Sequence, residues 1–92
     1  MTVGKPQIKL SEHARSQSVR RGLTEAAVLE VARAPEQRLA VRPGREIRQS
    51  RISVLPGATL YLLRVVVDAG PDEETVVTVY RTSKIEKYWS NA

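Results

Sequence analysis

Cysteine is absent from this chain of 92 residues, and histidine occurs once, at His13. The lack of cysteine excludes disulfides, thiolate metal ligands and a cysteine nucleophile, and it fits a reducing compartment. A single histidine without cysteine cannot build a tetrahedral metal site. A chain of this length buries only about 60% of its unfolded surface, which leaves room for one modest core. We therefore expect one domain over residues 1–92, with no metal and no deeply enclosed cofactor.

Long apolar runs and glycine-rich phosphate motifs are also missing. The apolar runs are only a few residues long, as at 65–67, and the N-terminal MTVGKPQIK has no apolar stretch typical of a signal peptide. Neither G-x-x-x-x-G-K-S/T nor G-x-G-x-x-G occurs, so a nucleotide cradle has no support. We expect a cytoplasmic protein that does not enter a membrane.

Positive charge is abundant and unevenly placed. Residues 1–51 hold eleven Lys and Arg against five Asp and Glu, whereas residues 52–92 hold four against five. Eleven of the fifteen basic residues are arginine, whose planar guanidinium binds a phosphate with two parallel hydrogen bonds. This composition is typical of phosphate recognition, although a GC-rich genome produces the same bias.

Two helices are predicted in the first third of the chain. Ser11 is suited to cap a helix that runs to about Arg21 and ends at Gly22, after a short extended segment at 8–10. Thr24 is suited to cap a second helix through about Ala34, because apolar residues recur at helical spacing before a proline.

Four strands are predicted in the remainder, at 39–41, 47–54, 60–68 and 75–82, joined by short turns. Loss of alternation between Ile47 and Ile52 suggests a β-bulge near Ser50. The expected fold is therefore α+β, with two N-terminal helices packed on one face of a four-stranded antiparallel sheet and a polar opposite face. Tyr88 and Trp89 are expected to cover the core.

His13 is the residue best suited to acid–base chemistry. A helix N-terminus and neighbouring arginines both oppose protonation, so a neutral imidazole can accept a proton. RNA supplies its own nucleophile, the 2′-hydroxyl, and its metal-free cleavage needs a base or acid with cationic groups around the phosphorane. The alternative is an exposed histidine on a solvated helix.

Several stretches together resemble a known family. They are SEHARSQSVRRG, the VARAPE that ends the second helix, the Gly44-Arg45-Glu46 turn, LRVVVD, and VVTVYRTSKIEKYW. They are similar to a small prokaryotic family of unknown function with H-A-x-x-R-x-x-x-R-G and V-V-T-x-Y-x-T-S-K motifs. That family looks related to the RelE-like toxins, within the metal-independent ribonucleases that include barnase, EndoU and tRNA-cleaving colicins.

The resemblance implies a RelE-like domain with an RNA site where the first helix meets the polar sheet face. One departure is that Arg20 and Arg21 both precede Gly22, and the arginine nearer the histidine has no match beyond Arg15. The hypothesis assigns chemistry to His13, Tyr80 and Lys84. It assigns phosphate binding to Arg15, Arg21, Arg45, Arg64, Thr78 and Thr82.

The implied partners are RNA, including RNA held on the ribosome, and an acidic antitoxin that covers the arginines. The rival interpretation is a non-catalytic RNA-binding or protein-interaction module of the same fold. For the strand arginines, exposed surface charge is an equally good explanation.

Overall fold

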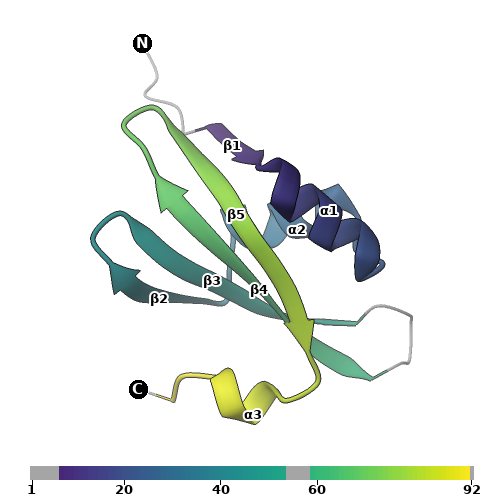
Figure 1. The fold of residues 1–92 in the computed structure, drawn as a ribbon. Helices are drawn as coiled ribbons and strands as arrows, with labels where there is room; N and C mark the ends of the chain where they lie inside the picture. The colour runs from purple at the N-terminus through teal and green to yellow at the C-terminus, as the bar shows by residue number, and fades with distance from the viewer. Residues whose placement is uncertain (1–6, 54–58, 92) are drawn as a thin grey trace.

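The computed structural model describes residues 7–53 and 59–91 of the chain (Figure 1). In chain order, its elements are β1 (Gln7–Leu10), α1 (Glu12–Arg20), α2 (Glu25–Arg33), β2 (Gln37–Arg42), β3 (Arg45–Ser53), β4 (Leu60–Ala69), β5 (Glu73–Thr82) and α3 (Ile85–Tyr88). The helix and strand predictions are confirmed within a few residues. No helix in these two ranges is long and apolar enough to cross a membrane.

The sheet has five strands in the order β1-β5-β4-β3-β2. The β2 to β5 strands are antiparallel neighbours, and β1 pairs with β5 in parallel. The predicted RelE-like arrangement, two helices on four antiparallel strands, is therefore wrong. Short turns identify antiparallel neighbours, but the parallel pairing joins the two ends of the chain, so no local signal revealed it.

Both predicted helix caps are present. The Ser11 hydroxyl accepts a hydrogen bond from the Ala14 amide at 3.1 Å, and the Thr24 hydroxyl does the same for Ala27 at 3.1 Å. Gly22 ends α1 with a φ of 66°, a left-handed conformation that favours glycine.

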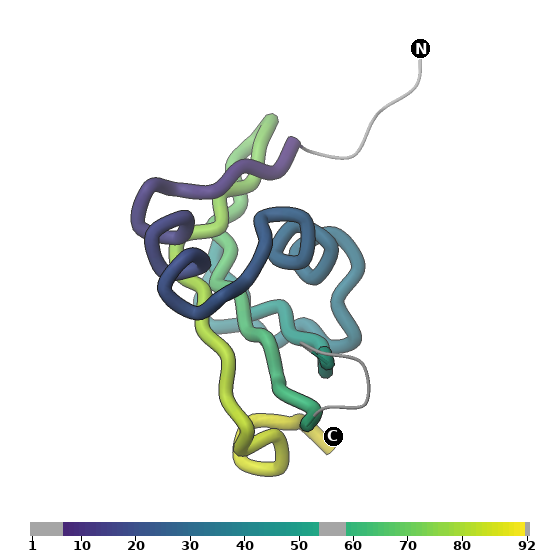
Figure 2. Tube along the Cα trace, turned by 90° about the vertical axis from the view of Figure 1, so that its right-hand side faces the viewer, coloured from purple at the N-terminus to yellow at the C-terminus, as the bar shows by residue number. Residues whose placement is uncertain are grey.

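The apolar core lies between the helices and one face of the sheet. Figure 2 shows α2 on one side of the sheet and α3 beyond its lower end. Buried apolar side chains of both helices meet those of β4 and β5; they include Ala14, Val28, Val31, Leu63, Val65, Val67, Val76 and Val79. Leu63, Val65 and Val67 of β4 alternate along the strand and all belong to this core. We call the opposite side of the sheet, with Gln49, Arg64 and Tyr80, the open face.

The predicted bulge near Ser50 is wrong. The β3 and β4 strands pair without interruption from Arg45 opposite Asp68 to Ser53 opposite Leu60. The register shifts lie between Ala40 and Arg42, and between Val66 and Val67. The polar run at 48–50 resembled a loss of alternation because its side chains are buried on both faces.

Candidate nucleic-acid interface on the open face

Arg64 lies at the centre of the open face. In the middle of β4, it is opposite Gln49 of β3 and Tyr80 of β5. Its exposed fraction is only 7%, and Gln49 is fully buried. A guanidinium stays protonated even in such a position, so this sheet face carries a fixed, partly desolvated positive charge.

Only neutral groups hold the Arg64 guanidinium. Its Nε donates to Gln49 Oε1 at 2.8 Å, and Nη1 donates to the Tyr80 hydroxyl. The guanidinium carbon lies 4.4 Å from the centroid of the Tyr88 ring and 5.4 Å from that of Tyr80, which are cation–π distances. The two rings pack edge to face at 6.3 Å. Arg64 is thus fixed in place without being neutralised.

The arginines of β3 that pair with carboxylates show the contrast. Each makes a two-point hydrogen-bonded ion pair: Arg45 with Asp68, Arg48 with Glu74, and Arg51 with Glu36. Hydrogen bonds from these guanidiniums lower the pKa of all three carboxyls, that of Glu36 to about 2. Among the described residues Arg64 has no ion pair, so no carboxylate neutralises its charge.

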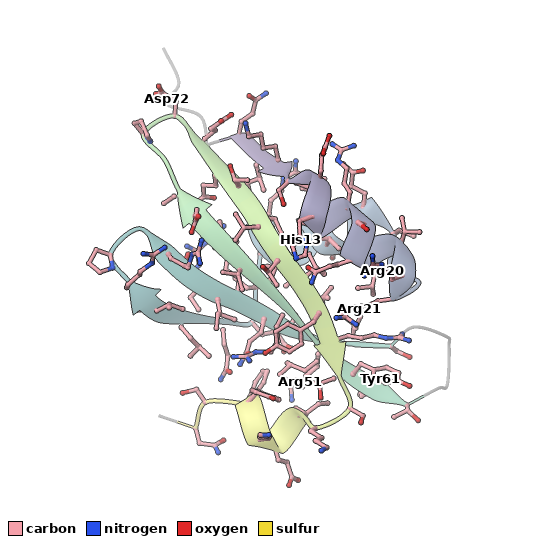
Figure 3. All side chains as sticks on the ribbon, in the orientation of Figure 1. His13, Arg20, Arg21, Arg51, Tyr61 and Asp72 are labelled. Atoms are coloured by element: carbon pink, nitrogen blue, oxygen red, sulfur yellow. The ribbon has the colours of Figure 1, made fainter. Side chains whose placement is uncertain are left out.

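Further cations flank the second half of β5. Figure 3 shows Arg20 and Arg21 beside this half of the strand. Within the described ranges, five basic residues there lack a carboxylate partner: Arg20, Arg21, Arg81, Lys84 and Lys87. Arg81 is opposite Leu63, on the helix side of the sheet, and Arg20 and Arg21 lie at the end of α1, so these cations border β5 and do not continue the open face.

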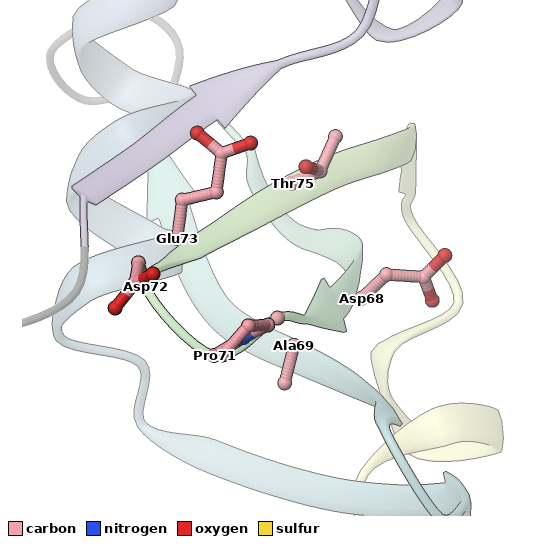
Figure 4. Close-up of a pocket in the computed structure, with 7 residues that line it drawn as sticks. Asp68, Ala69, Pro71, Asp72, Glu73 and Thr75 are labelled. Carbon is pink, nitrogen blue, oxygen red and sulfur yellow. The ribbon is translucent and has the colours of Figure 1, made fainter.

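The other end of β5 is acidic. A surface hollow of about 400 Å³ at the β4–β5 turn is lined by Asp68, Asp72 and Glu73 (Figure 4). No group of three metal-ligating side chains occurs in the part of the chain that the structure covers. Two of these carboxylates are ion-paired, Asp68 with Arg45 and Glu73 with Lys9, so their charge is largely compensated.

The comparisons with known proteins identify the family. The model for Domain of unknown function (DUF4258) matches residues 10–81. The chain belongs to the DUF4258 family. No curated protein and no solved structure matches it. The matched region contains Gln49, Arg64 and Tyr80 but ends before α3.

In this DUF4258 domain, Arg64 and Tyr80 are the predicted site residues that the structure brings into contact. His13 is exposed and lies on the side of α1 that faces β5 (Figure 3). Lys84 is exposed beyond β5, where its amide donates to the Thr82 hydroxyl at 3.0 Å. The three groups assigned to chemistry are therefore not assembled around one point.

The other predicted phosphate ligands have different placements. Arg15 is exposed 3.7 Å from Glu25, and Arg45 is paired with Asp68. Thr78 is half-buried, opposite Val66, on the same face as Tyr80. Thr82 is half-buried opposite Leu62, so Thr78 and Thr82 lie two residues to either side of Tyr80 in register.

Arg21 has a structural contact with the sheet. β1 pairs only with residues 73–76 of β5, and beyond that point two side chains at α1 bind the β5 edge. Gln17 Oε1 accepts from the Val79 amide at 2.8 Å, and Arg21 Nε donates to the Val79 carbonyl at 3.3 Å. These bonds satisfy a strand edge that would otherwise be open to pairing with another chain. Since His13, Gln17 and Arg21 are four residues apart, they share the helix face directed at β5.

Sequence reasoning missed the residues that hold Arg64. Gln49 and Gln37 form a hydrogen-bonded pair at 2.7 Å, and Tyr88 was assigned to the core although it packs on the open face. The available signal was the run Arg48-Gln49-Ser50 inside a strand, because three consecutive polar residues there require partners on both faces.

Proposed function

We propose that this domain binds single-stranded RNA on the open face and cleaves it without a metal ion. The observation that carries the proposal is the Arg64 guanidinium, which is buried, held by neutral groups and placed beside the Tyr80 ring. Arginine and aromatic rings together suit a backbone phosphate and an unstacked base. The cations along β5 would follow the adjoining phosphates.

In the proposed chemistry, Arg64 binds the scissile phosphate and stabilises the charge of the phosphorane. The Tyr80 hydroxyl accepts from Arg64, so its own proton is free to be donated to a phosphate oxygen or to the leaving 5′-oxygen. His13 lies apart from Arg64 and Tyr80, so it would have to reach the same phosphate in the complex to take the proton of the 2′-hydroxyl as that oxygen attacks phosphorus. The bond to the 5′-oxygen breaks and a 2′,3′-cyclic phosphate forms.

Binding is tested by fluorescence anisotropy with a labelled single-stranded RNA at low salt. Arg64→Met should weaken binding about tenfold or more and flatten the salt dependence by about 0.7 in log–log slope, the loss of one phosphate contact. Arg33→Met is the matched control, because it removes the same charge from α2 on the other side of the sheet.

Gln49→Glu is the sharper variant. It keeps the side-chain shape and places a carboxylate where Oε1 now accepts from Arg64, so the guanidinium gains an internal counter-ion. The change also removes the Nε2 donor to Gln37 Oε1 and to the Tyr88 carbonyl, so circular dichroism must first show that the fold is kept. Binding should then fall as far as in Arg64→Met. Unchanged RNA affinity in both variants would refute a phosphate site at Arg64.

Cleavage is tested separately in excess EDTA. The proposal requires a 2′,3′-cyclic phosphate product, no cleavage of DNA, and a rate that falls about 10²–10⁴-fold in His13→Ala and in Tyr80→Phe. RNA binding through Arg64 without cleavage would instead identify a non-catalytic RNA-binding module. The separate placement of His13, at the β5 edge, and of Lys84, beyond the end of β5, favours that second candidate.

A relationship to the RelE-like toxins, with an acidic antitoxin as partner, remains a prediction from the motifs. Expression of the parent chain should then slow bacterial growth, and Arg64→Met should relieve the effect when Arg33→Met does not. Equal growth of all three strains at equal protein level would argue against toxicity.

A further inference from the structure

The C-terminal segment, residues 85–91, lies against the open face at the lower end of the sheet (Figure 1). Two buried or half-buried glutamines bind its main chain. Gln37 makes two bonds with Ser90: its Nε2 donates to the Ser90 carbonyl at 2.6 Å, and its Oε1 accepts from the Ser90 amide at 3.0 Å. Gln49 donates to the Tyr88 carbonyl at 3.0 Å. The two-point contact with Ser90 resembles the pairing of one strand residue with its neighbour.

Aromatic side chains of the same segment cover two arginines. The Tyr88 ring lies over the Arg64 guanidinium, and the Trp89 ring lies 4.4 Å from that of Arg51. Arg64 has its Nε occupied by Gln49, its Nη1 bonded to Tyr80 and one face covered by Tyr88. Its exposed fraction of 7% leaves little of the guanidinium for a bidentate phosphate contact.

We propose that residues 85–91 are a tethered occupant of the RNA site, which must leave the open face before RNA can bind Arg64. This inference rests on the proposed RNA binding and adds its regulation. The surface of Gln37, Gln49, Arg51 and Arg64 is then a binding surface for an extended peptide that carries adjacent aromatic residues. Residues 85–91 lie outside the residues that match the family model, so their contact with the open face is made by a segment beyond the matched region.

Competition of this kind has a defined consequence. When the binding-competent state is only a fraction of the population, the apparent Kd for RNA exceeds the intrinsic Kd by the inverse of that fraction. A change that releases the segment without altering Arg64 should therefore tighten RNA binding. A change that merely damages the site should weaken it.

Ser90→Pro provides such a release in the full chain. Proline has no amide hydrogen, so the bond from the Ser90 amide to Gln37 is lost, while Arg64, Gln49 and Tyr80 are unchanged. Ser90→Ala is the matched control because the segment is held through the main chain of this residue. Trp89, the single tryptophan, reports release through stronger quenching of its fluorescence by acrylamide.

We expect Ser90→Pro to bind the labelled RNA roughly three- to tenfold more tightly than Ser90→Ala, in step with increased quenching. A second full-length variant, Tyr88→Ala with Trp89→Ala, removes both rings and should also tighten binding. If both variants bind RNA with the affinity of the parent, and Arg64→Met still abolishes it, the tethered occupant is refuted and the RNA site stands. If none of these proteins binds RNA, the proposed function itself is wrong.

Discussion

Arg48 connects the sheet to α2 and is the buried charge whose removal should affect stability most. Its guanidinium donates to both Glu74 carboxylate oxygens, at 2.9 and 2.5 Å, to Glu46 at 2.7 Å and to the Ala32 carbonyl at 2.7 Å. Only 3% of the residue is exposed. Its charge and four hydrogen bonds therefore join β3, β5 and the end of α2 on the helix side of the sheet.

Arg48→Met keeps the unbranched apolar stem of the side chain and removes all four bonds. Breaking a buried ion pair on one side costs about 3–5 kcal/mol. The side chains of Glu74 and Glu46 are 14% and 28% exposed, so water partly solvates them and reduces this figure. Loss of the donor to Ala32 adds about 1 kcal/mol. We expect a total of about 3 kcal/mol, against about 5–14 kcal/mol for a domain of this size.

The free energy of unfolding is measured by urea titration with circular dichroism, and thermal unfolding should show a fall of about 12–24 °C. Arg38→Met is the control: it removes an exposed arginine from the same Glu46 and should change stability by about 0.5 kcal/mol or less. Arg48→Met with Glu74→Leu should recover most of the loss, since no unpaired charge remains. A loss below about 1 kcal/mol in Arg48→Met would refute the reasoning.

Three further predictions concern pH, the sheet edge and His13. Hydrogen bonds from their arginine partners lower the pKa of Glu36 from 4.5 to about 2 and also lower the pKa values of Asp68 and Glu74. The stabilisation is complete above the unfolded pKa values and is lost as pH falls through the folded ones. Urea midpoints should therefore decline as the pH drops from about 4.5 toward 2, and less so in Glu36→Gln. Gln17→Ala leaves an amide of β5 without its acceptor and should cost about 1 kcal/mol in urea unfolding. His13→Ala should change unfolding by no more than about 0.5 kcal/mol, so a larger loss would show that His13 is structural.

Much of the local structure was predictable because its signals are local. Ser11 and Thr24 cap the helices that they were predicted to cap, and the strands predicted at 60–68 and 75–82 form there. Capping depends on side-chain and main-chain groups three residues apart, and strand alternation depends on a period of two. The predicted membership of a family of unknown function is also confirmed.

The candidate site was only partly predictable. Arg64 and Tyr80 were named from the sequence, but Gln49, Gln37 and Tyr88 were missed, and His13 and Lys84 do not join them. The sequence does not distinguish an exposed arginine from an ion-paired arginine, or from a buried arginine without a counter-ion. The difference lies in which residue stands opposite, and that depends on the register between strands.

The sequence by itself determined the elements, the basic character and the family of this protein, because these properties depend on composition and on neighbours along the chain. The tertiary structure alone decided that β1 joins β5 in parallel, that three arginines of β3 are neutralised while Arg64 is not, and that the C-terminal segment lies over Arg64. The physical reason is that each of these features joins residues distant in sequence, whose contact is set by strand order and register.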